Sequence, residues 1–484
     1  MSRVDVAGHS VSTEHYIDGA RVGSAATFED RSPIDQALLA EVSRGDAATA
    51  DAAISAATRA FPAWAALGPD GRAGYLHRLA ELIDEHSDMI AEVECRDMAM
   101  LERSLKARVI GRGARNYRAY ADLCVAYAER VWESNGTVNR VVRNPSGPAV
   151  VITPWNAPFM LSTWKTAPAL AAGCTVVLKP AEWSPLSCSL LFDLVDEAGF
   201  PPGVFNLVQG IGEEVGPALT GDPRVRRLSF TGSTDTARVI GRAAAGNIVP
   251  FTAELGGKNP LLVFADADLD LAAQKAALQY DDAGQVCLSG TRLLVEESVV
   301  DAFLERFHGY VDAQVLGDPR DEATTISPLI HPEHLARVAG FVDRARESGD
   351  EIVRGGKQPA IGGLWYEQTL IRPRSNDSEI VQNEVFGPVL TLQTFTSEDE
   401  AIALANSTPY GLSGIAFTAS AERADRVGRA VRAGTFWVNC FLVRDLTAPF
   451  GGAGQSGIGR EGGDYALDFY SDLKTLQIAD GTTG

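Results

Sequence analysis

The chain has 484 residues, which is too long for one simple hydrophobic core, so two or three domains are expected. Its content of hydrophobic residues (45%) and charged residues (22%) is that of an ordinary globular enzyme. The formal net charge of -20 argues against nucleic acid as a partner, because phosphate binding needs a surplus of lysine and arginine.

The cysteines and the apolar segments suggest the compartment. Six cysteines are scattered without a C-x-x-C pair, so neither a disulfide framework nor a zinc knuckle is expected, and the cytoplasm is the predicted compartment. Residues 1–20 lack an apolar core and therefore do not predict a signal peptide. The longest weakly polar run, 166–178, is too short to span a bilayer and is interrupted by Pro168 and Gly173, so no membrane association is expected.

The pattern of apolar residues predicts helices first and then an alternation of strands and helices. Helices are expected at 46–62 and 71–106. From about residue 148, helical stretches at 186–198 and 234–245 lie between short β-branched runs at 149–152, 175–178, 204–208 and 228–230. This alternation predicts a parallel sheet covered by helices on both faces, with ligands beyond the carboxyl ends of its strands.

A second alternating block begins near residue 259, so two α/β lobes are expected to meet near 255. Its predicted strands are 260–264, 292–295, 389–392 and 436–438. Residues 131–146 predict a hairpin that turns at Asn135-Gly136, and residues 469–478 could supply a further strand.

Cys287 and Glu254 are the residues most indicative of chemistry. Cys287 ends a GQVC segment, and Glu254 begins an ELGGK segment about thirty residues upstream. A thiolate can attack an electrophilic carbon, and a nearby carboxylate can activate water to release the product. A lone cysteine is more often a small buried residue, so this interpretation depends on the upstream motifs.

The nucleotide signal lies at residues 178–182. Glu182 follows a predicted strand, where a carboxylate can accept both hydroxyls of an adenosine ribose and would repel a 2′-phosphate, which favours NAD over NADP. Lys179 could donate to the same ribose, with a surface Lys–Glu pair as the alternative. Residues 230–233 end a strand and begin a helix whose N–H groups could meet a phosphate. The glycine pattern at 457–462 lacks a preceding strand, and a tight turn explains that at 210–216 better.

No metal site is expected. His331 and His334 lack a third ligand, so the start of a helix is the favoured explanation. Asp266, Asp268 and Asp270 mimic a calcium loop but lack its glycine and its distal glutamate, and they are expected to cap the next helix instead.

Seven blocks make the chain resemble the aldehyde dehydrogenase superfamily over nearly its whole length. They are TPWNAP at 153–158, KPAE at 179–182, FTGS at 230–233, ELGGK at 254–258, GQVC at 284–287, NEVFGP at 383–388 and PFGG at 449–452. The resemblance implies an α/β fold with two parallel-sheet lobes and a small bridging element. It assigns 1–123 and 147–255 to a Rossmann-like NAD-binding domain, 256–455 to a catalytic domain, and 124–146 and 456–484 to bridging segments. A homodimer or homotetramer is implied.

The resemblance also implies roles for individual residues. Cys287 is the expected nucleophile, Asn156 the oxyanion donor and Glu254 the general base. Glu384 is expected on the nicotinamide ribose, with Phe386 beside it. The remaining members of the expected cofactor site are Ile152, Thr153, Pro154, Trp155, Lys179, Ala181, Glu182, Gly216, Phe230, Gly232, Ser233 and Leu255.

For the substrate, the chain looks like the branch that oxidises hydroxymuconic-type semialdehydes from aromatic ring cleavage. Arg444 in a VRDL segment and Arg118 in a NYRAY segment resemble that branch, and Trp164 is added to the substrate site. A semialdehyde carries a carboxylate, which arginine binds in a bidentate manner. The alternatives are a helical pair of Arg118 with Asp122 and a pair of Arg444 with its neighbouring acid or solvent.

Two other functions remain open. The branch often has a second arginine where this chain has Thr447, which makes a neutral aromatic or aliphatic aldehyde the alternative substrate. A CoA-acylating enzyme is disfavoured because such relatives commonly lack the carboxylate that corresponds to Glu254. A catalytically silent binding protein is disfavoured because Cys287, Asn156 and Glu254 are all present.

Overall fold

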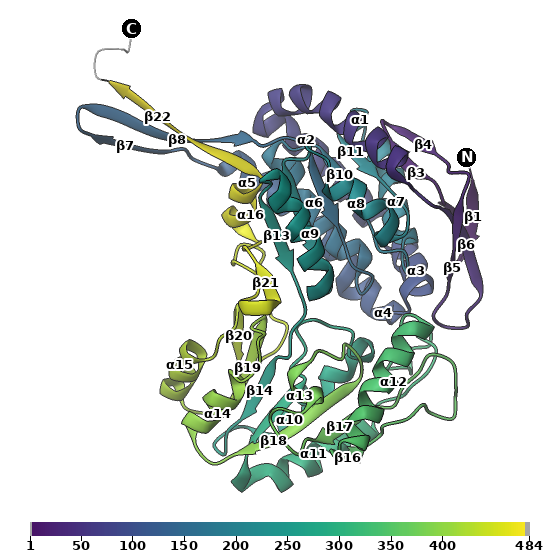
Figure 1. The fold of residues 1–484 in the computed structure, drawn as a ribbon, viewed down its shortest axis with the longest axis vertical. Helices are drawn as coiled ribbons and strands as arrows, with labels where there is room; N and C mark the ends of the chain where they lie inside the picture. The colour runs from purple at the N-terminus through teal and green to yellow at the C-terminus, as the bar shows by residue number, and fades with distance from the viewer. Residues whose placement is uncertain (1, 480–484) are drawn as a thin grey trace.

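The computed structural model of the protein describes residues 2–479, which form two α/β lobes and a projecting three-stranded sheet (Figure 1). The first lobe contains an eight-stranded sheet whose five central strands are parallel. In sheet order its strands are β21 (Gly457–Ile458), β13 (Phe251–Glu254), β12 (Arg227–Thr231), β9 (Ala149–Ile152), β10 (Val176–Lys179), β11 (Phe205–Leu207), β3 (His15–Ile17) and β4 (Ala20–Val22).

The second lobe contains a seven-stranded sheet that is parallel except for its edge strand β16. In sheet order its strands are β16 (Glu351–Arg354), β17 (Thr369–Arg372), β18 (Val389–Phe395), β15 (Arg292–Glu296), β14 (Pro260–Val263), β19 (Ser413–Phe417) and β20 (Thr435–Val438). The chain passes from the first sheet to the second between β13 and β14, as the sequence predicted.

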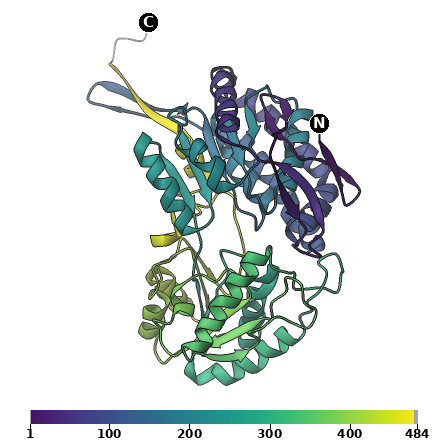
Figure 2. The ribbon, with the colours of Figure 1, turned by 45° about the vertical axis from the view of Figure 1, so that its right-hand side comes forward.

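Helices cover the faces of both sheets (Figure 2). In the first lobe they are α1 (Ala47–Ala66), α2 (Gly68–Glu85), α3 (Ser87–Met98), α4 (Glu102–Ser104), the π-helical turn η1 (Leu105–Val109), α5 (Ile110–Ala126), α6 (Pro158–Ala172), α7 (Leu186–Glu197), α8 (Gly212–Thr220), α9 (Thr234–Asn247) and α16 (Gly463–Phe469). In the second they are α10 (Leu269–Ala277), the 3₁₀ segment η2 (Leu278–Gly284), η3 (Glu297–Val299), α11 (Val300–Asp312), α12 (Pro332–Glu347), α13 (Glu379–Gln382), α14 (Glu398–Ala405), α15 (Ala421–Ala430) and η4 (Gly454–Ser456).

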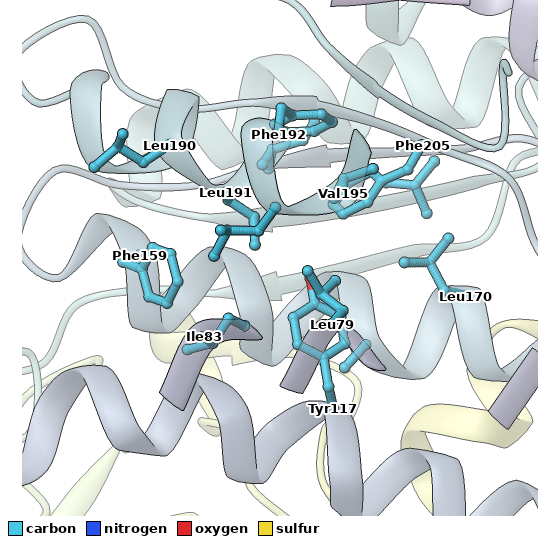
Figure 3. Close-up of a cluster of buried hydrophobic side chains, with 14 of the residues drawn as sticks. Leu79, Ile83, Tyr117, Phe159, Leu170, Leu190, Leu191, Phe192, Val195 and Phe205 are labelled. Atoms are coloured by element: carbon cyan, nitrogen blue, oxygen red, sulfur yellow. The ribbon is translucent and has the colours of Figure 1, made fainter. Parts of the chain in front are cut away.

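The central strands are continuous apolar runs because both of their faces are covered. All four residues of β10 and all four residues of β14 are buried. Part of the first lobe's core is shown in Figure 3, where α2, α5, α6 and α7 bring large apolar side chains together with Phe205 of β11. This core fixes the carboxyl ends of β9, β10, β12 and β13, from which the site residues extend.

The three-stranded sheet projects from the first lobe (Figures 1 and 2). It pairs β22 (Ser471–Ala479) with β8 (Thr137–Pro145), and β8 with β7 (Arg130–Ser134). The predicted hairpin is confirmed: Asn135 and Gly136 have φ of 53° and 70°, the left-handed conformation that a two-residue hairpin turn requires. The predicted strand near 469–478 is β22.

Several strands were missed by the sequence analysis. The N-terminal strands β1 (Arg3–Val6), β2 (His9–Ser12), β5 (Thr27–Arg31) and β6 (Leu38–Ser43), together with β3 and β4, are short and contain no run of β-branched residues. The interior strand β19 has the sequence SGIAF, whose small residues gave no β-branched run. The described residues contain no helix long and apolar enough to cross a membrane.

Candidate active site

A cavity of about 610 Å³ is lined by residues from both lobes. Asn156 and Glu254 reach it from the loop after β9 and the end of β13, and Cys287 reaches it from the loop after η2. The three residues predicted to carry the chemistry come from both lobes and therefore face one space.

A tight loop holds Cys287. Asn259 Nδ2 donates to the Cys287 backbone oxygen at 2.8 Å and to Ser289 O at 2.9 Å. Gly284 has a φ of 68°, and a Cβ at this position would lie 2.2 Å from the Gly387 backbone oxygen, so the loop before the thiol requires glycine here. Burial raises the pKa of the Cys287 thiol to about 12; the Glu384 carboxylate also raises it, and Arg444 opposes this shift.

This raised pKa predicts how the thiol reacts without cofactor. Because the thiolate is the nucleophile and the pKa lies above neutrality, alkylation of Cys287 by iodoacetamide is expected to accelerate about tenfold per pH unit from pH 7 to pH 9. Peptide mass spectrometry, which separates Cys287 from the partly exposed Cys440, provides the measurement. A rate that levels off below pH 8 would contradict the expectation.

Asn156 lies against the same loop. Its Nδ2 donates to the Gln285 backbone oxygen at 2.9 Å, two residues before Cys287. The side chain and the thiol both line the cavity. A side-chain amide beside a thiol is a group that can donate to an oxyanion formed at that thiol.

Glu254 is a buried carboxylate in the cavity wall. It is 5% exposed, and neither of its carboxylate oxygens has a hydrogen-bond partner among the described residues. Burial is the main cause that raises its pKa well above the ordinary value; Glu461 adds to the shift, and Lys165 opposes it. Glu461 accepts a hydrogen bond from Trp164 Nε1 at 2.6 Å and is ion-paired with buried Lys165. The sequence analysis missed Lys165 and Glu461, which are brought together only by the fold.

Glu384 and the aromatic residues around it form the other side of the cavity. Glu384 accepts from Gly257 N at 3.0 Å, and burial raises its pKa to about 7. Phe386 has a left-handed φ of 60° and packs edge-on against Trp155 at 5.3 Å between ring centroids. His334 was predicted to mark the start of a helix; it lies in α12, but its buried ring lines the cavity and contacts the Phe386 backbone oxygen at 2.7 Å.

Lys179 and Glu182 lie at the carboxyl end of β10, as predicted. Their charged groups are 3.1 Å apart, and Gly212 N at the start of α8 donates to Glu182 Oε1 at 3.4 Å. Ser233 caps α9 by accepting from Thr236 N at 3.2 Å, and it lines the cavity beside Gly232. A carboxylate at one strand end and a helix N-terminus near the next fit the ribose and the phosphates of a dinucleotide.

The expected cofactor residues divide into two groups. Those that line the cavity are Pro154, Trp155, Gly232, Ser233, Leu255, Glu384 and Phe386. Those outside its lining are Ile152, Thr153, Lys179, Ala181, Glu182, Gly216 and Phe230. The second group occupies the ends of β9, β10 and β12 and the interior of α8.

Arg118 does not line the cavity, and the expectation that it binds substrate is corrected. Its guanidinium forms an ion pair with Asp84 at 2.5 Å, on the face of α5 that packs against α2. The suggested alternative partner, Asp122, instead lies 3.1 Å from His77. Two other arginines of α5, Arg112 and Arg115, line the cavity, and the sequence analysis missed both. Arg112 is the partly buried one, whereas Arg115 is exposed.

Arg112, Arg444 and Trp164 lie together in the cavity. The guanidinium carbons of Arg112 and Arg444 lie 5.6 and 5.9 Å from the Trp164 ring centroid, and that of Arg444 lies 3.8 Å from the Phe450 ring. Burial lowers the pKa of Arg112 to about 10, helped by Arg444 and Arg115. Neither Arg112 nor Arg444 forms an ion pair with a residue between 2 and 479, so both cations are available to an anion.

The fold and the cavity define a class: a two-lobed α/β protein in which a cysteine thiol, an asparagine amide and a buried carboxylate line one cavity. A model of the aldehyde dehydrogenase family matches residues 21–476. The 2-hydroxymuconic semialdehyde dehydrogenase of Pseudomonas sp. (strain CF600) is 41% identical, with 96% of this chain and 99% of the relative covered. The 2-aminomuconic 6-semialdehyde dehydrogenase of a Pseudomonas species is 38% identical, with 96% and 97% covered.

A solved structure agrees with these relatives. Betaine aldehyde dehydrogenase from Staphylococcus aureus in complex with NAD⁺ superposes with a TM-score of 0.95 at 37% identity, covering 98% of this chain and 96% of that chain. The chain belongs to the aldehyde dehydrogenase family. Its activity is the NAD-dependent oxidation of an aldehyde to a carboxylic acid.

Proposed function

We propose that Cys287, Asn156 and Glu254 carry out the covalent chemistry of this oxidation. The Cys287 thiolate adds to the aldehyde carbon and gives a tetrahedral thiohemiacetal. The Asn156 amide and the Cys287 backbone N–H donate to the oxygen on which charge develops. Bound NAD would supply the hydride acceptor. Loss of the hydride from the thiohemiacetal carbon leaves a thioester on Cys287. Glu254 then takes a proton from water, which attacks the thioester and releases the acid.

The burial of Glu254 supports its role as base. A carboxylate with two unpartnered oxygens in the cavity wall can accept a proton from water, and its raised pKa makes it a stronger base than an exposed glutamate. The pKa of Glu254 also depends on two buried neighbours, because Glu461 raises it and Lys165 lowers it.

We propose that the residues at the strand ends hold NAD. Lys179 and Glu182 would bind the adenosine ribose, Gly232 and Ser233 the phosphates, and Glu384 the nicotinamide ribose, with Phe386 beside it. The ion pair of Lys179 with Glu182 supports this assignment, because it orients a carboxylate toward the first turn of α8. The remaining predicted cofactor residues flank these contacts.

The substrate that the cavity supports best is a semialdehyde with a carboxylate at its far end. The observation that carries this proposal is the pair Arg112 and Arg444, two cations in the cavity without ion pairs to described residues. Partly buried guanidinium groups bind carboxylates through charge-assisted hydrogen bonds. The names of the two semialdehyde dehydrogenases described above support the same substrate class.

Substitution of these arginines tests the substrate class. Arg112→Ala and Arg444→Ala are each expected to lower kcat/KM for 6-oxohexanoate by roughly ten- to hundredfold, the value of a lost charge-assisted hydrogen bond. The kcat/KM for hexanal, which has the same chain length and no carboxylate, should change little in either variant. Arg118→Ala is the matched control and should resemble wild type, because Arg118 pairs with Asp84 outside the cavity.

A neutral aldehyde is the second candidate substrate. The aromatic rings of Trp164 and Phe450 line the cavity next to Arg444 and give it an apolar surface. Thr447 occupies the position at which the resembled branch often has a second arginine. Equal kcat/KM for hexanal and 6-oxohexanoate in the wild-type enzyme would favour this candidate.

We propose the division of the chain into an NAD-binding domain (1–123 and 147–255), a catalytic domain (256–455) and bridging segments. The two parallel sheets support the first two parts. Because β21 pairs with β13 of the first sheet, the second bridging segment is better begun at β22 than at residue 456. The cytoplasm remains the proposed compartment, in keeping with six cysteines that are all free.

We propose that the projecting sheet joins subunits into a homodimer or homotetramer. Three of its apolar side chains are exposed: Val131 at 52%, Trp132 at 37% and Leu473 at 55%. Such exposed apolar groups are typical of an interface. Light scattering should give a mass that is a multiple of 51.5 kDa, and Leu473→Asp should shift it toward 51.5 kDa. A wild-type monomer would contradict the proposal.

A further inference from the structure

Asp282 is a buried acid in the cavity that the proposed chemistry does not use. It stands in η2, in the segment that leads to Cys287, and it is 9% exposed. It lines the same cavity as Cys287 and Arg112. The carboxylate makes no hydrogen bond or ion pair with another residue of the described chain, which leaves a buried polar group facing the substrate space.

The backbone fixes this carboxylate in an uncommon conformation. Asp282 and Ala283 have φ of 52° and 55°, and Gly284 continues the left-handed run at 68°. Left-handed backbone is costly for residues with a Cβ and collects at functional sites. The Asp282 backbone oxygen accepts from both Gln285 N and Gln285 Nε2 at 3.1 Å, so the loop is held in place.

The cation nearest in effect to the Asp282 carboxylate is Arg108, and it does not pair with it. Burial raises the pKa of Asp282, and Arg108 is the cation that opposes this shift. Arg108 is exposed at the cavity rim and forms no ion pair with Asp282 within the described residues. A buried carboxylate without a hydrogen bond is unfavourable, so a donor group that enters the cavity would be bound there.

We propose that Asp282 is a specificity-determining residue that accepts a hydrogen bond from a hydroxyl or amino group on the substrate chain. The inference rests on the proposed function, in which Arg112 and Arg444 bind the substrate carboxylate. The substrate is then a semialdehyde with two recognition groups, a carboxylate and a hydrogen-bond donor near it. The names of the two semialdehyde relatives include a hydroxy and an amino group at position 2.

Two aldehydes that differ by one hydroxyl provide the test. The ratio of kcat/KM for 2-hydroxy-6-oxohexanoate to that for 6-oxohexanoate is measured in wild type, Asp282→Gly and Ala283→Gly. Glycine accepts the left-handed backbone, so Asp282→Gly removes the carboxylate without strain. Ala283→Gly changes the neighbouring left-handed residue and keeps the carboxylate. Wild type and Ala283→Gly should prefer the hydroxylated substrate by roughly ten- to hundredfold, and Asp282→Gly should lose this preference.

Asp282→Asn covers the case in which the glycine variant does not fold. Asparagine tolerates the left-handed conformation and keeps an acceptor oxygen without charge, so the ratio should fall between those of wild type and Asp282→Gly. A ratio unchanged by Asp282→Asn, or activity that falls equally with both substrates in the Asp282 variants, would overturn the inference and leave Asp282 a structural residue of the loop.

The experiment separates this inference from the proposed function. Wild-type enzyme that prefers 6-oxohexanoate to hexanal but not the hydroxylated form to 6-oxohexanoate would overturn the role of Asp282 alone. Wild-type enzyme without preference for 6-oxohexanoate over hexanal would overturn the substrate class and this inference together.

Discussion

Replacement of Cys287 by alanine is expected to abolish aldehyde oxidation, with kcat lowered by at least about 10³-fold. The thiol lies in the cavity beside Asn156, and no other cysteine is among the lining residues, so no second thiol can form the covalent intermediate. NAD binding should persist, because the residues proposed to bind the adenosine ribose and the phosphates are on the other lobe. NADH formation measures the first effect, and quenching of tryptophan fluorescence by NAD measures the second.

Loss of both activity and NAD binding in Cys287→Ala would show that the substitution disturbs the cavity as a whole. Cys440→Ala is the matched control, because Cys440 is the other partly exposed cysteine and lies outside the cavity lining. It should retain oxidation at close to the wild-type rate. A Cys287→Ala enzyme that still produces NADH at an appreciable rate would contradict the assignment of the nucleophile.

Replacement of Glu254 by glutamine should block the second half of the reaction rather than the first. Glutamine keeps the shape of the side chain but cannot take a proton from water, so steady-state turnover should fall by roughly 10²- to 10⁴-fold. The thioester on Cys287 should then accumulate, because the steps before hydrolysis do not need the base. Intact-protein mass spectrometry after mixing with NAD and aldehyde should show the mass of one acyl group.

The matched control for Glu254→Gln is Glu461→Gln. Glu461 raises the pKa of Glu254, so neutralising it should shift the pH dependence of thioester hydrolysis to lower pH, because a carboxylate with a lowered pKa is deprotonated at lower pH. It should not by itself trap an acyl-enzyme. A Glu254→Gln enzyme that turns over normally, or that is free of acyl groups although inactive, would contradict the role of Glu254.

The residues proposed to carry the chemistry could be singled out because each lies at the end of a strand or after a tight loop that the sequence marks. Asn156 follows the run 149–152, Glu254 ends β13, and Cys287 follows the left-handed Gly284. Asn156 and Glu254 meet because the carboxyl ends of the parallel strands β9 and β13 share an edge of the first sheet. Cys287 precedes β15 of the second sheet and reaches the cavity from the other lobe. The short strands β3 and β19 could not be predicted, because neither has a run of β-branched residues and their pairing is set by distant segments.

The arginine of α5 that is proposed to bind substrate could not be chosen from the sequence. Arg112 and Arg118 are six residues apart, which turns them about 240° from each other around a helix. Nothing in the sequence shows which of these faces meets the cavity, because α5 packs against both α2 and α6. The π-helical turn η1 directly before α5 also rotates the faces of α5 relative to the preceding residues, and the spacing of apolar residues in the sequence does not reveal this rotation.

The buried pair of Lys165 and Glu461 escaped prediction for a related reason. The two residues lie in α6 and just before α16, and they meet only because the chain returns to the first lobe after β20. Local patterns carry no signal for such a contact.

The most direct test of the account is NADH formation by the purified enzyme with NAD and two aldehydes of equal length, 6-oxohexanoate and hexanal. The account predicts oxidation of both aldehydes with stoichiometric formation of the acids. The kcat/KM for 6-oxohexanoate should be at least about tenfold higher than that for hexanal, and this preference should disappear in Arg112→Ala and Arg444→Ala. No NADH from either aldehyde, or a preference for hexanal that the arginine substitutions leave unchanged, would contradict it.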